Sequence, residues 1–336
     1  MDSVSPRAAD SANTLRSDDA LGEEAAPAAI RTEGLTKRYG DDVLAVDGLD
    51  LTVTEGEIFG FLGPNGAGKS TTIDVLMDYA RPTSGTATVL GYDSQQDTNE
   101  IHRRVGILPD GYALYDRLTG REHLEYAIDL KGAEDDPATL LERVGLSTEA
   151  AARRAGGYSK GMGQRLALAI ALVDDPALLI LDEPSSGLDP NGVRLVREIA
   201  RDHADRGKTV FFSSHILSQV EAVCDRVGIL DSGQLVAVDS IEGLRDSFGT
   251  GSTVTLSVDA VPESLALETL DAVTSVTVDG RQIRATVSEP GAKIAVIDSV
   301  RETGAAILDI STDEASLEDL FAATTGTAGA ATEGER

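Results

Sequence analysis

The sequence has 336 residues, enough for a large hydrophobic core and for more than one domain. Its 57 acidic and 29 basic residues give a formal charge of −28, which disfavours free nucleic acid as a partner. This charge predicts a protein of a salt-rich, halophilic cytoplasm, because at molar salt the Debye length falls to about 3 Å and like charges are screened. The single cysteine, Cys224, excludes an internal disulfide and is expected to be a buried, inert thiol.

The N-terminal residues carry little structural signal. Residues 1–27 are rich in Ala, Ser, Asp and Glu, and predict a disordered acidic tail without the apolar core of a signal peptide. Apolar runs such as Leu178–Leu181 are far shorter than the roughly 20 residues of a membrane helix, so the chain is expected inside the cell. From Ile30 the pattern changes, and Val43 to Val53 alternates like a strand around an expected turn at Asp47-Gly48.

A strand, a loop and a helix are predicted next. The apolar run Ile58–Leu62 is followed by GPNGAGKS, which fits the phosphate-binding pattern G-x-x-x-x-G-K-[ST] at every fixed position. Its glycines let backbone N–H groups turn around an anion, and the helix over Thr72–Tyr79 adds the positive end of its dipole. A glycine-rich turn without a ligand is the weaker alternative. The residues expected to bind ATP here are Gly63, Pro64, Asn65, Gly66, Ala67, Gly68, Lys69, Ser70 and Thr71.

Two of these side chains have distinct expected roles. Lys69 would reach the β- and γ-phosphates, and the Ser70 hydroxyl would complete the oxygen shell of a Mg²⁺ ion.

Short strands are expected at Thr86–Leu90 and Val105–Leu108. Thr119 to Leu130 predicts a helix with a capping box, Thr119 and Glu122, and helical segments continue to about Arg154 as an insertion in a strand-rich core.

Two buried strands are expected to deliver catalytic groups. Leu178–Leu181 ends at Asp182 and Glu183, and ligands of doubly wound α/β sheets lie beyond the carboxyl ends of strands. Asp182 is suited to hold Mg²⁺ and Glu183 to act as the general base toward water, although acidic residues can also simply cap a turn. Thr209–Phe212 brings His215 to the same edge, where a neutral imidazole could bond to a γ-phosphate. The other histidines, His102, His123 and His203, are expected to be solvated.

The order of these motifs points to a family. The phosphate loop, YSKGM at 158–162, LLILDEP, SGLDP at 186–190 and SSH together resemble the ATP-binding subunit of ABC transporters over roughly residues 30–240. The resemblance implies an α/β P-loop ATPase core, residues 28–240, with an antiparallel β subdomain, a helical subdomain, and ATP and Mg²⁺ as cofactors. It also implies that Tyr39, otherwise an ordinary turn tyrosine, stacks on the adenine. Ser159 and Gly161 would clasp the γ-phosphate bound to a second copy, and Asp189 would lie at the dimer seam.

Two positions depart from the commonest family pattern. The signature, usually LSGGQ, keeps only its serine and second glycine, and Asp110 replaces a frequent glutamine that touches Mg²⁺. Both departures resemble the ABC-2 type exporters of drugs, lipids or copper. They imply a homodimer or heterodimer at the cytoplasmic face of a membrane, and a separate permease contacted through the region after Asp110. Apolar residues there are Tyr112, Leu114, Tyr115 and Leu118.

The amino-acid composition changes again after about Ser240. It predicts a small accessory α+β domain over residues 241–324 and a flexible tail over 325–336. No catalytic constellation is visible there, so a packing or regulatory role, such as a dimer contact, is expected. The expected elements are a strand at Ser252–Val258, a helix at Pro262–Leu270, a hairpin at Val273–Val287 turning at Asp279-Gly280, a helix at Lys293–Thr303, a strand at Ala305–Ser311 and a helix at Ser316–Ala323.

Two other functions compete with the transporter subunit. A soluble relative in translation or DNA repair predicts tandem cassettes or a long coiled-coil insertion, and the sequence has neither pattern. A nucleotide-binding regulator that does not hydrolyse ATP predicts a lost base, whereas Glu183 and His215 are both present. The transported substrate cannot be read from this chain, because its path lies in another polypeptide.

Overall fold

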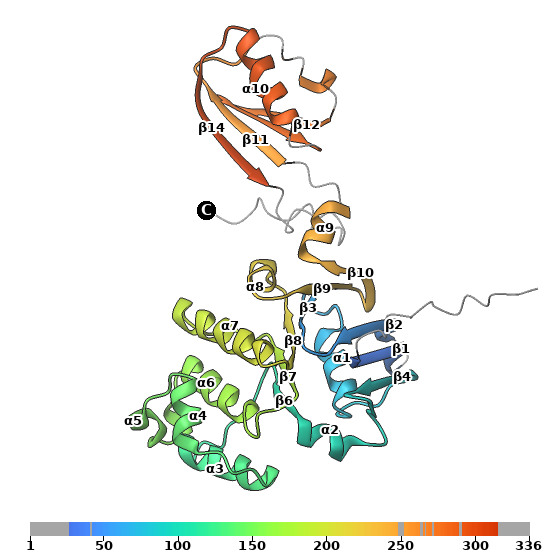
Figure 1. The fold of residues 1–336 in the computed structure, drawn as a ribbon, viewed down its shortest axis with the longest axis vertical. Helices are drawn as coiled ribbons and strands as arrows, with labels where there is room; N and C mark the ends of the chain where they lie inside the picture. Colours follow the sequence, from blue (N-terminus) through green and yellow to red (C-terminus); the bar gives the residue numbers. More distant parts are fainter. Residues whose placement is uncertain are drawn as a thin grey trace, which may run out of the picture.

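The computed structural model describes residues 27–314, except 41, 248–251, 263, 264, 266, 271, 289 and 290. The described residues form three β-sheets and their surrounding helices (Figure 1). None of the helices in this part of the chain has the length and apolarity needed to cross a bilayer. The predicted N-terminal tail, the helix predicted at Ser316–Ala323 and the C-terminal tail lie outside the described residues.

The central sheet has six strands in the order β10-β9-β3-β8-β7-β6, and every pair except the β9–β10 pair is parallel. The strands β3, β7 and β8 are buried throughout, which explains why they are continuous apolar runs in the sequence. The predicted buried strands are therefore confirmed. The bounds are β3 Ile58–Leu62, β6 Val105–Leu108, β7 Leu178–Asp182, β8 Thr209–Ser214, β9 Arg226–Asp231 and β10 Gln234–Ser240.

Alternate residues of these strands point into two different cores. Leu179 and Leu181 of β7 join the core made with α6, α7 and α8, whereas Leu178 and Ile180 join the core made with α1. The sheet therefore lies between two layers, and its carboxyl edge stays open for the loops that follow each strand. The helix bounds are α1 Lys69–Leu76, α2 Thr98–Arg104, α6 Lys160–Ala171, α7 Pro190–Asp205 and α8 Leu217–Glu221.

The second sheet is antiparallel, in the order β2-β1-β4-β5, and confirms the predicted β subdomain. The turn predicted at Asp47-Gly48 is wrong, because one strand continues through both residues. Gly48 has φ +62° beside a register shift against the neighbouring strand, so this glycine serves a β-bulge. The strands are β1 Ala28–Tyr39, β2 Val43–Thr54, β4 Ser84–Val89 and β5 Tyr92–Asp93.

The predicted helical insertion is present, and so is its capping box. The side chain of Thr119 accepts a hydrogen bond from the Glu122 N–H, and the Glu122 carboxylate accepts one from the Thr119 N–H at 2.7 Å. Within the predicted bounds lie α3 Gly120–Lys131, α4 Pro137–Arg143 and α5 Thr148–Ala151, and the short helix η1 Ala155–Gly157 and α6 follow them.

The expectation of solvated histidines is wrong for two of the three residues. His203 is fully buried, because it follows Val196, Ile199 and Ala200 on the inner face of α7. Burial lowers the pKa of the His203 imidazole to about 4. His123 is 5% exposed, and its Nε2 accepts a hydrogen bond from the Tyr115 N–H at 2.9 Å. These positions show that polar neighbours in sequence did not decide the exposure of a helical histidine.

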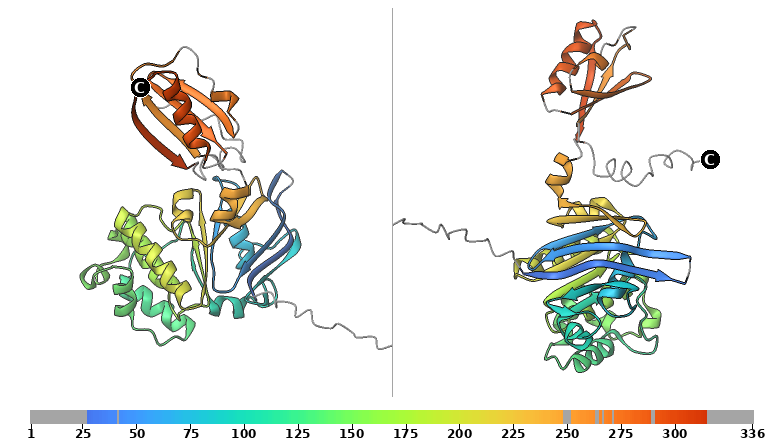
Figure 2. Two further views of the ribbon diagram at one scale, coloured as in Figure 1. Left: turned by 45° about the horizontal axis from the view of Figure 1, so that its top comes forward. Right: turned by 90° about the vertical axis from the view of Figure 1, so that its right-hand side faces the viewer.

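The C-terminal residues form an antiparallel sheet, β12-β13-β11-β14, with a core of their own. Figure 2 shows this sheet beyond α9, which joins it to the preceding strand β10. The predicted hairpin is confirmed, with Gly280 at φ +57° in its turn. The elements are α9 Ile241–Ser247, β11 Ser252–Val258, the short helix η2 Leu267–Thr269, β12 Val273–Asp279, β13 Gln282–Val287, α10 Ala292–Glu302 and β14 Ile307–Glu314.

The helix predicted at Pro262–Leu270 is wrong in extent, since its described residues contain only the single turn η2. Leu265 and Leu267 both pack against the core of this sheet. Residues two apart point to different sides of a helix, so one regular helix would not bury both side chains. The single turn lets both leucines face inward.

Candidate nucleotide-binding site

The predicted phosphate loop joins the carboxyl end of β3 to the start of α1 at Lys69. Two of its glycines lie where a side chain has no room. A Cβ atom on Gly63 would lie 2.4 Å from the carbonyl oxygen of Leu230, and one on Gly68 would lie 2.3 Å from that of Ala45. Gly68 also has φ +107°, a backbone conformation that favours glycine. The glycines of the motif therefore let the loop pack tightly against both sheets.

The Lys69 side chain is buried, with 6% of its surface exposed. Its Nζ donates hydrogen bonds to the Gly63 carbonyl at 2.7 Å and the Pro64 carbonyl at 3.3 Å. The same ammonium lies 3.4 Å from Oε1 of Glu183. The buried ammonium is therefore held between the loop carbonyls and the Glu183 carboxylate.

Asp182 and Glu183 lie at the carboxyl end of β7, as the sequence predicts. The Asp182 carboxylate is 3% exposed and accepts a hydrogen bond from the hydroxyl of Ser213, its register partner on β8. The pKa of the nearby Asp74 carboxyl is raised, first by burial and second by the charge of Asp182.

Glu183 is held in a sparsely populated backbone conformation, with φ +47°. Its N–H donates to the Ser213 carbonyl at 3.2 Å, which fixes the turn after β7. The Glu183 side chain is 13% exposed and lies between Lys69 and His215, with Oε2 2.9 Å from His215 Nδ1. The strained turn thus points one carboxylate at two basic side chains from two other elements.

His215 follows β8, and 44% of its side chain is exposed. In this geometry Nδ1–H donates to Glu183, so a neutral ring carries only a lone pair at Nε2. Donation from Nε2 to a phosphate therefore requires an imidazolium or release of Glu183. This hydrogen bond fits an orientation of Glu183 by His215, and the contact of the imidazole with a γ-phosphate stays a prediction.

One cavity of about 410 Å³ is lined by the phosphate loop together with Asp110 and Glu183, whereas Gly63, Pro64 and Ala67 of the loop do not line it. Tyr39 is not among the residues that line it. The Tyr39 ring lies at the end of β1 with 43% of the residue exposed, and the Lys37 ammonium lies 4.7 Å from the ring centroid. The lining residues are Ala45, Asn65, Gly66, Gly68, Lys69, Ser70, Thr71, Asp110 and Glu183.

A second cavity, of about 640 Å³, contains the predicted signature and shares no lining residue with the first. Ser159 is the N-cap of α6, and its hydroxyl accepts from the Met162 N–H at 3.3 Å. Asp189 caps α7 in the same way, by accepting from the Gly192 N–H at 2.8 Å. Ser159, Gly161 and Asp189 therefore lie together, but apart from the phosphate loop of their own chain.

Sequence reasoning missed three residues that support these sites. Ser213 holds Asp182, the Gln164 side chain donates to the Pro184 carbonyl at 3.1 Å, and the Lys160 ammonium donates to the Ser186 hydroxyl at 2.9 Å. Ser213, near the carboxyl end of the buried strand β8, was visible in the sequence. The contacts of Gln164 and Lys160 depend on how α6 packs, which no local pattern encodes.

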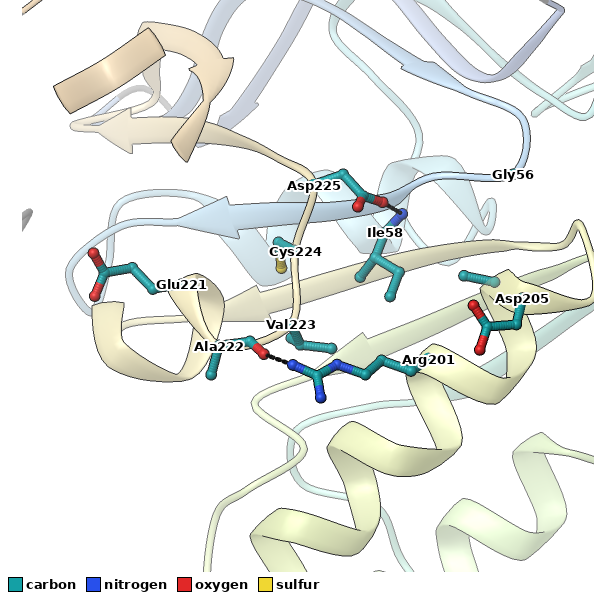
Figure 3. A pocket seen from close by; sticks show the side chains of 10 residues that line it. Gly56, Ile58, Arg201, Asp205, Glu221, Ala222, Val223, Cys224 and Asp225 are labelled. Carbon is teal, nitrogen blue, oxygen red and sulfur yellow. Dashed lines mark hydrogen bonds between the residues drawn. The ribbon is translucent and has the colours of Figure 1, made fainter. Parts of the chain in front are cut away.

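A further cavity, of about 490 Å³, lies at the opposite edge of the sheet, where β3 and β9 begin (Figure 3). The Ile58 N–H donates to the Asp225 carboxylate at 2.8 Å, and Arg201 donates to the Ala222 carbonyl beside it. Burial raises the pKa of the Cys224 thiol there, which agrees with the predicted inert cysteine. The cavity belongs to neither predicted site, because those sites follow the carboxyl ends of the strands.

Comparison with known proteins identifies the family. The ABC transporter family model matches residues 46–186. The linearmycin resistance ATP-binding protein LnrL of Bacillus subtilis is 34% identical over 307 residues, covering 88% of this chain and 98% of that protein. The daunorubicin/doxorubicin resistance ATP-binding protein DrrA of Streptomyces peucetius is 35% identical, with coverages of 89% and 92%.

A solved structure agrees with the sequence comparison. The structure of the ATP binding subunit of an ABC transporter is 29% identical and superposes with a TM-score of 0.61, covering 66% of this chain and 93% of the other. The described fold, the phosphate loop and the relatives that match over most of the chain all indicate the same family. The chain belongs to the ABC transporter family, as one of its ATP-binding proteins.

Proposed function

We propose that this chain hydrolyses Mg²⁺-ATP at the cytoplasmic face of a membrane and so drives a separate permease that exports its substrate. The observation that carries the proposal is the convergence of Lys69, Glu183 and His215 over the phosphate loop. These are a cation for phosphate, a carboxylate for water and a residue that orients the carboxylate. A nucleotide-binding regulator without hydrolysis has no use for that third residue.

The side chains around the first cavity fit ATP and Mg²⁺. Lys69 would bind the β- and γ-phosphates, and the backbone from Gly63 to Thr71 would enclose them. Ser70, Asp110 and Asp182 offer the oxygen ligands that Mg²⁺ prefers, and Ser70 and Asp110 both line the cavity. When bound, the ion would neutralise charge that develops on the phosphate oxygens.

Glu183 is the proposed general base. Its Oε2 is oriented by His215, and its carboxylate would take a proton from the water that attacks the γ-phosphate. Lys69, beside Oε1, would stabilise the negative charge that remains on the transferred group. Tyr39, exposed at the end of β1, is the proposed platform for the adenine ring.

We infer that a second copy, or a close relative, completes each reaction centre. Ser159, Gly161 and Asp189 offer a hydroxyl, a helix start and a carboxylate in a cavity separate from the phosphate loop. Their use on the partner's nucleotide would make ATP the link between two subunits, and hydrolysis would weaken that link.

The permease contact is proposed for the segment that follows Asp110. Tyr115 has 65% of its surface exposed, whereas Tyr112 and Leu114 pack partly against the main core. Tyr115 is therefore the apolar side chain of this segment that a partner could cover most fully. Export is favoured because LnrL and DrrA are named as resistance proteins. The unit over residues 241–324 is proposed to have an accessory role in packing or regulation.

Copurification tests the proposal. The tagged full-length chain, isolated from detergent-solubilised membranes of its own host, should bring down a polytopic membrane protein and hydrolyse ATP with it. Recovery with ribosomes or with soluble DNA repair proteins, and without a membrane protein, would contradict the transporter function and favour the soluble alternative.

A further inference from the structure

The first turns of α6 are bonded to the loop from Pro184 to Asp189 at three points. The Lys160 ammonium donates to the Ser186 hydroxyl at 2.9 Å, and the Gln164 amide donates to the Pro184 carbonyl at 3.1 Å. Nη2 of Arg165 lies 3.6 Å from the Asp189 carboxylate. Hydrogen bonds and an ion pair therefore connect the signature residues at the start of α6 with the loop that ends at the Asp189 carboxylate.

Lys160 is the exposed one of these three α6 residues, yet its side chain packs closely against the loop. A Cβ atom on Gly187 would lie 2.4 Å from Cδ and 2.7 Å from Cε of Lys160, so the lysine stem crosses directly over the glycine backbone. Gly187 has φ +75°, a conformation that most side chains disfavour. Stem and ammonium together cover the middle of the loop.

The backbone of Lys160 makes a further contact. Its carbonyl accepts a hydrogen bond from the Tyr112 hydroxyl at 3.1 Å. Tyr112 belongs to the segment after Asp110, and its ring lies where a side chain on Gly163 of α6 would clash. Lys160 thus contacts the loop through its side chain and the segment after Asp110 through its backbone.

We propose that Lys160 is a positioning residue that fixes the loop from Pro184 to Asp189 onto the signature, so that both act on the partner's nucleotide together. This inference rests on the proposed shared reaction centre. Lys160 lies in the second cavity with Ser159 and Asp189, and it does not line the cavity of its own phosphate loop. Its loss should therefore act on the chemical step of the opposite site rather than on nucleotide binding in its own chain.

Steady-state kinetics provide the first test. Lys160→Met keeps an unbranched stem over Gly187 but removes the donor to Ser186, and should lower kcat for Mg-ATP by about tenfold with KM changed less than about twofold. Lys160→Arg, which retains a donor, should recover most of the loss. The matched control is Arg194→Met, which removes an 80% exposed cation of α7 and should leave the rate unchanged. An unaltered kcat in Lys160→Met would overturn the inference.

Mixing of variants tests whether Lys160 acts across the dimer. A chain with Lys160→Met keeps its phosphate loop, and a chain with Lys69→Ala keeps its signature. Mixed dimers would contain one intact composite site, so the mixture should hydrolyse ATP several times faster than the sum of the separate variants. No gain would contradict action of Lys160 across the dimer.

A second mixture separates this failure from failure of the shared centre. Ser159→Arg mixed with Lys69→Ala should gain activity by the same reasoning. Gain in that pair, without gain in the Lys160 pair, would overturn the role of Lys160 and leave the shared centre standing. Absence of gain in both pairs would remove the shared centre and the inference together.

Discussion

The Glu183 carboxylate lies 2.9 Å from Nδ1 of His215, although 32 residues separate them in the chain. Parallel strands β7 and β8 bring both residues to one edge, where the strained turn at Glu183 holds its carboxylate between His215 and Lys69. A general base needs this kind of fixed orientation, because its carboxylate oxygen must point at the attacking water to accept a proton from it.

Glu183→Gln should abolish steady-state ATP turnover. The amide keeps the shape of the side chain but cannot accept a proton from water, so kcat should fall on the order of 100-fold or more. Release of phosphate from Mg-ATP measures the loss. Glu198→Gln is the matched control, since Glu198 is 55% exposed and paired with Arg194 on α7. Turnover at the parent rate in Glu183→Gln would reject Glu183 as the base.

Ser213→Ala should destabilise the fold. Its hydroxyl donates to the Asp182 carboxylate, which is 3% exposed and would lose a hydrogen bond where water does not readily replace it. Such a loss costs about 1–3 kcal/mol of the free energy of unfolding. Urea unfolding gives the value, with Ser84→Ala, an exposed serine of β4, as control. Equal losses in both variants would show that the bond contributes nothing.

Acid should destabilise the protein through His203. The buried imidazole has a pKa of about 4 against an ordinary value of 6.5, so the unfolded chain binds the proton more readily. The contribution is complete above pH 6.5 and is lost as the pH falls toward 4. It amounts to at most about 3.4 kcal/mol, since the pKa is lowered from 6.5 to about 4 and one pKa unit corresponds to about 1.36 kcal/mol.

Urea unfolding between pH 7 and pH 5 measures this effect. His203→Gln should flatten the pH dependence, whereas His102→Gln, at a partly buried histidine bonded to the Met77 carbonyl, should retain it. An unchanged slope in His203→Gln would show that another group causes the acid sensitivity.

Features encoded by neighbouring residues could be predicted from the sequence. The phosphate loop, the buried strands ending at Asp182 and Ser214, and the capping box at Thr119 depend on residue types at short, fixed spacings. Placement of Asp182, Glu183 and His215 at one edge followed from the direction of parallel strands.

Features that depend on packing between distant segments could not be predicted. Gly48 forms a bulge because β2 pairs with β1, whereas the sequence alone predicted a turn at this glycine. His203 is buried because α7 packs on the sheet. The bond from Lys160 to Ser186 joins residues 26 positions apart, and neither side chain has a local reason to meet the other.

The charge of −28 leads to a prediction about salt. Carboxylates that repel one another should make the protein less stable in dilute buffer, and molar KCl shortens the Debye length to about 3 Å and removes most of the repulsion. Thermal unfolding across a KCl series should therefore show a rising midpoint. Equal midpoints at low and molar KCl would contradict adaptation to a salt-rich cytoplasm.

The separation of the phosphate loop from the signature makes the shared reaction centre the central claim. The most direct test is the rate of ATP hydrolysis per subunit during about a thousandfold dilution, because mass action dissociates a dimer as concentration falls. We expect the rate per subunit to fall with dilution and to vanish at every concentration in Ser159→Arg. A rate that stays flat, or that survives in Ser159→Arg, would contradict a centre built by two chains.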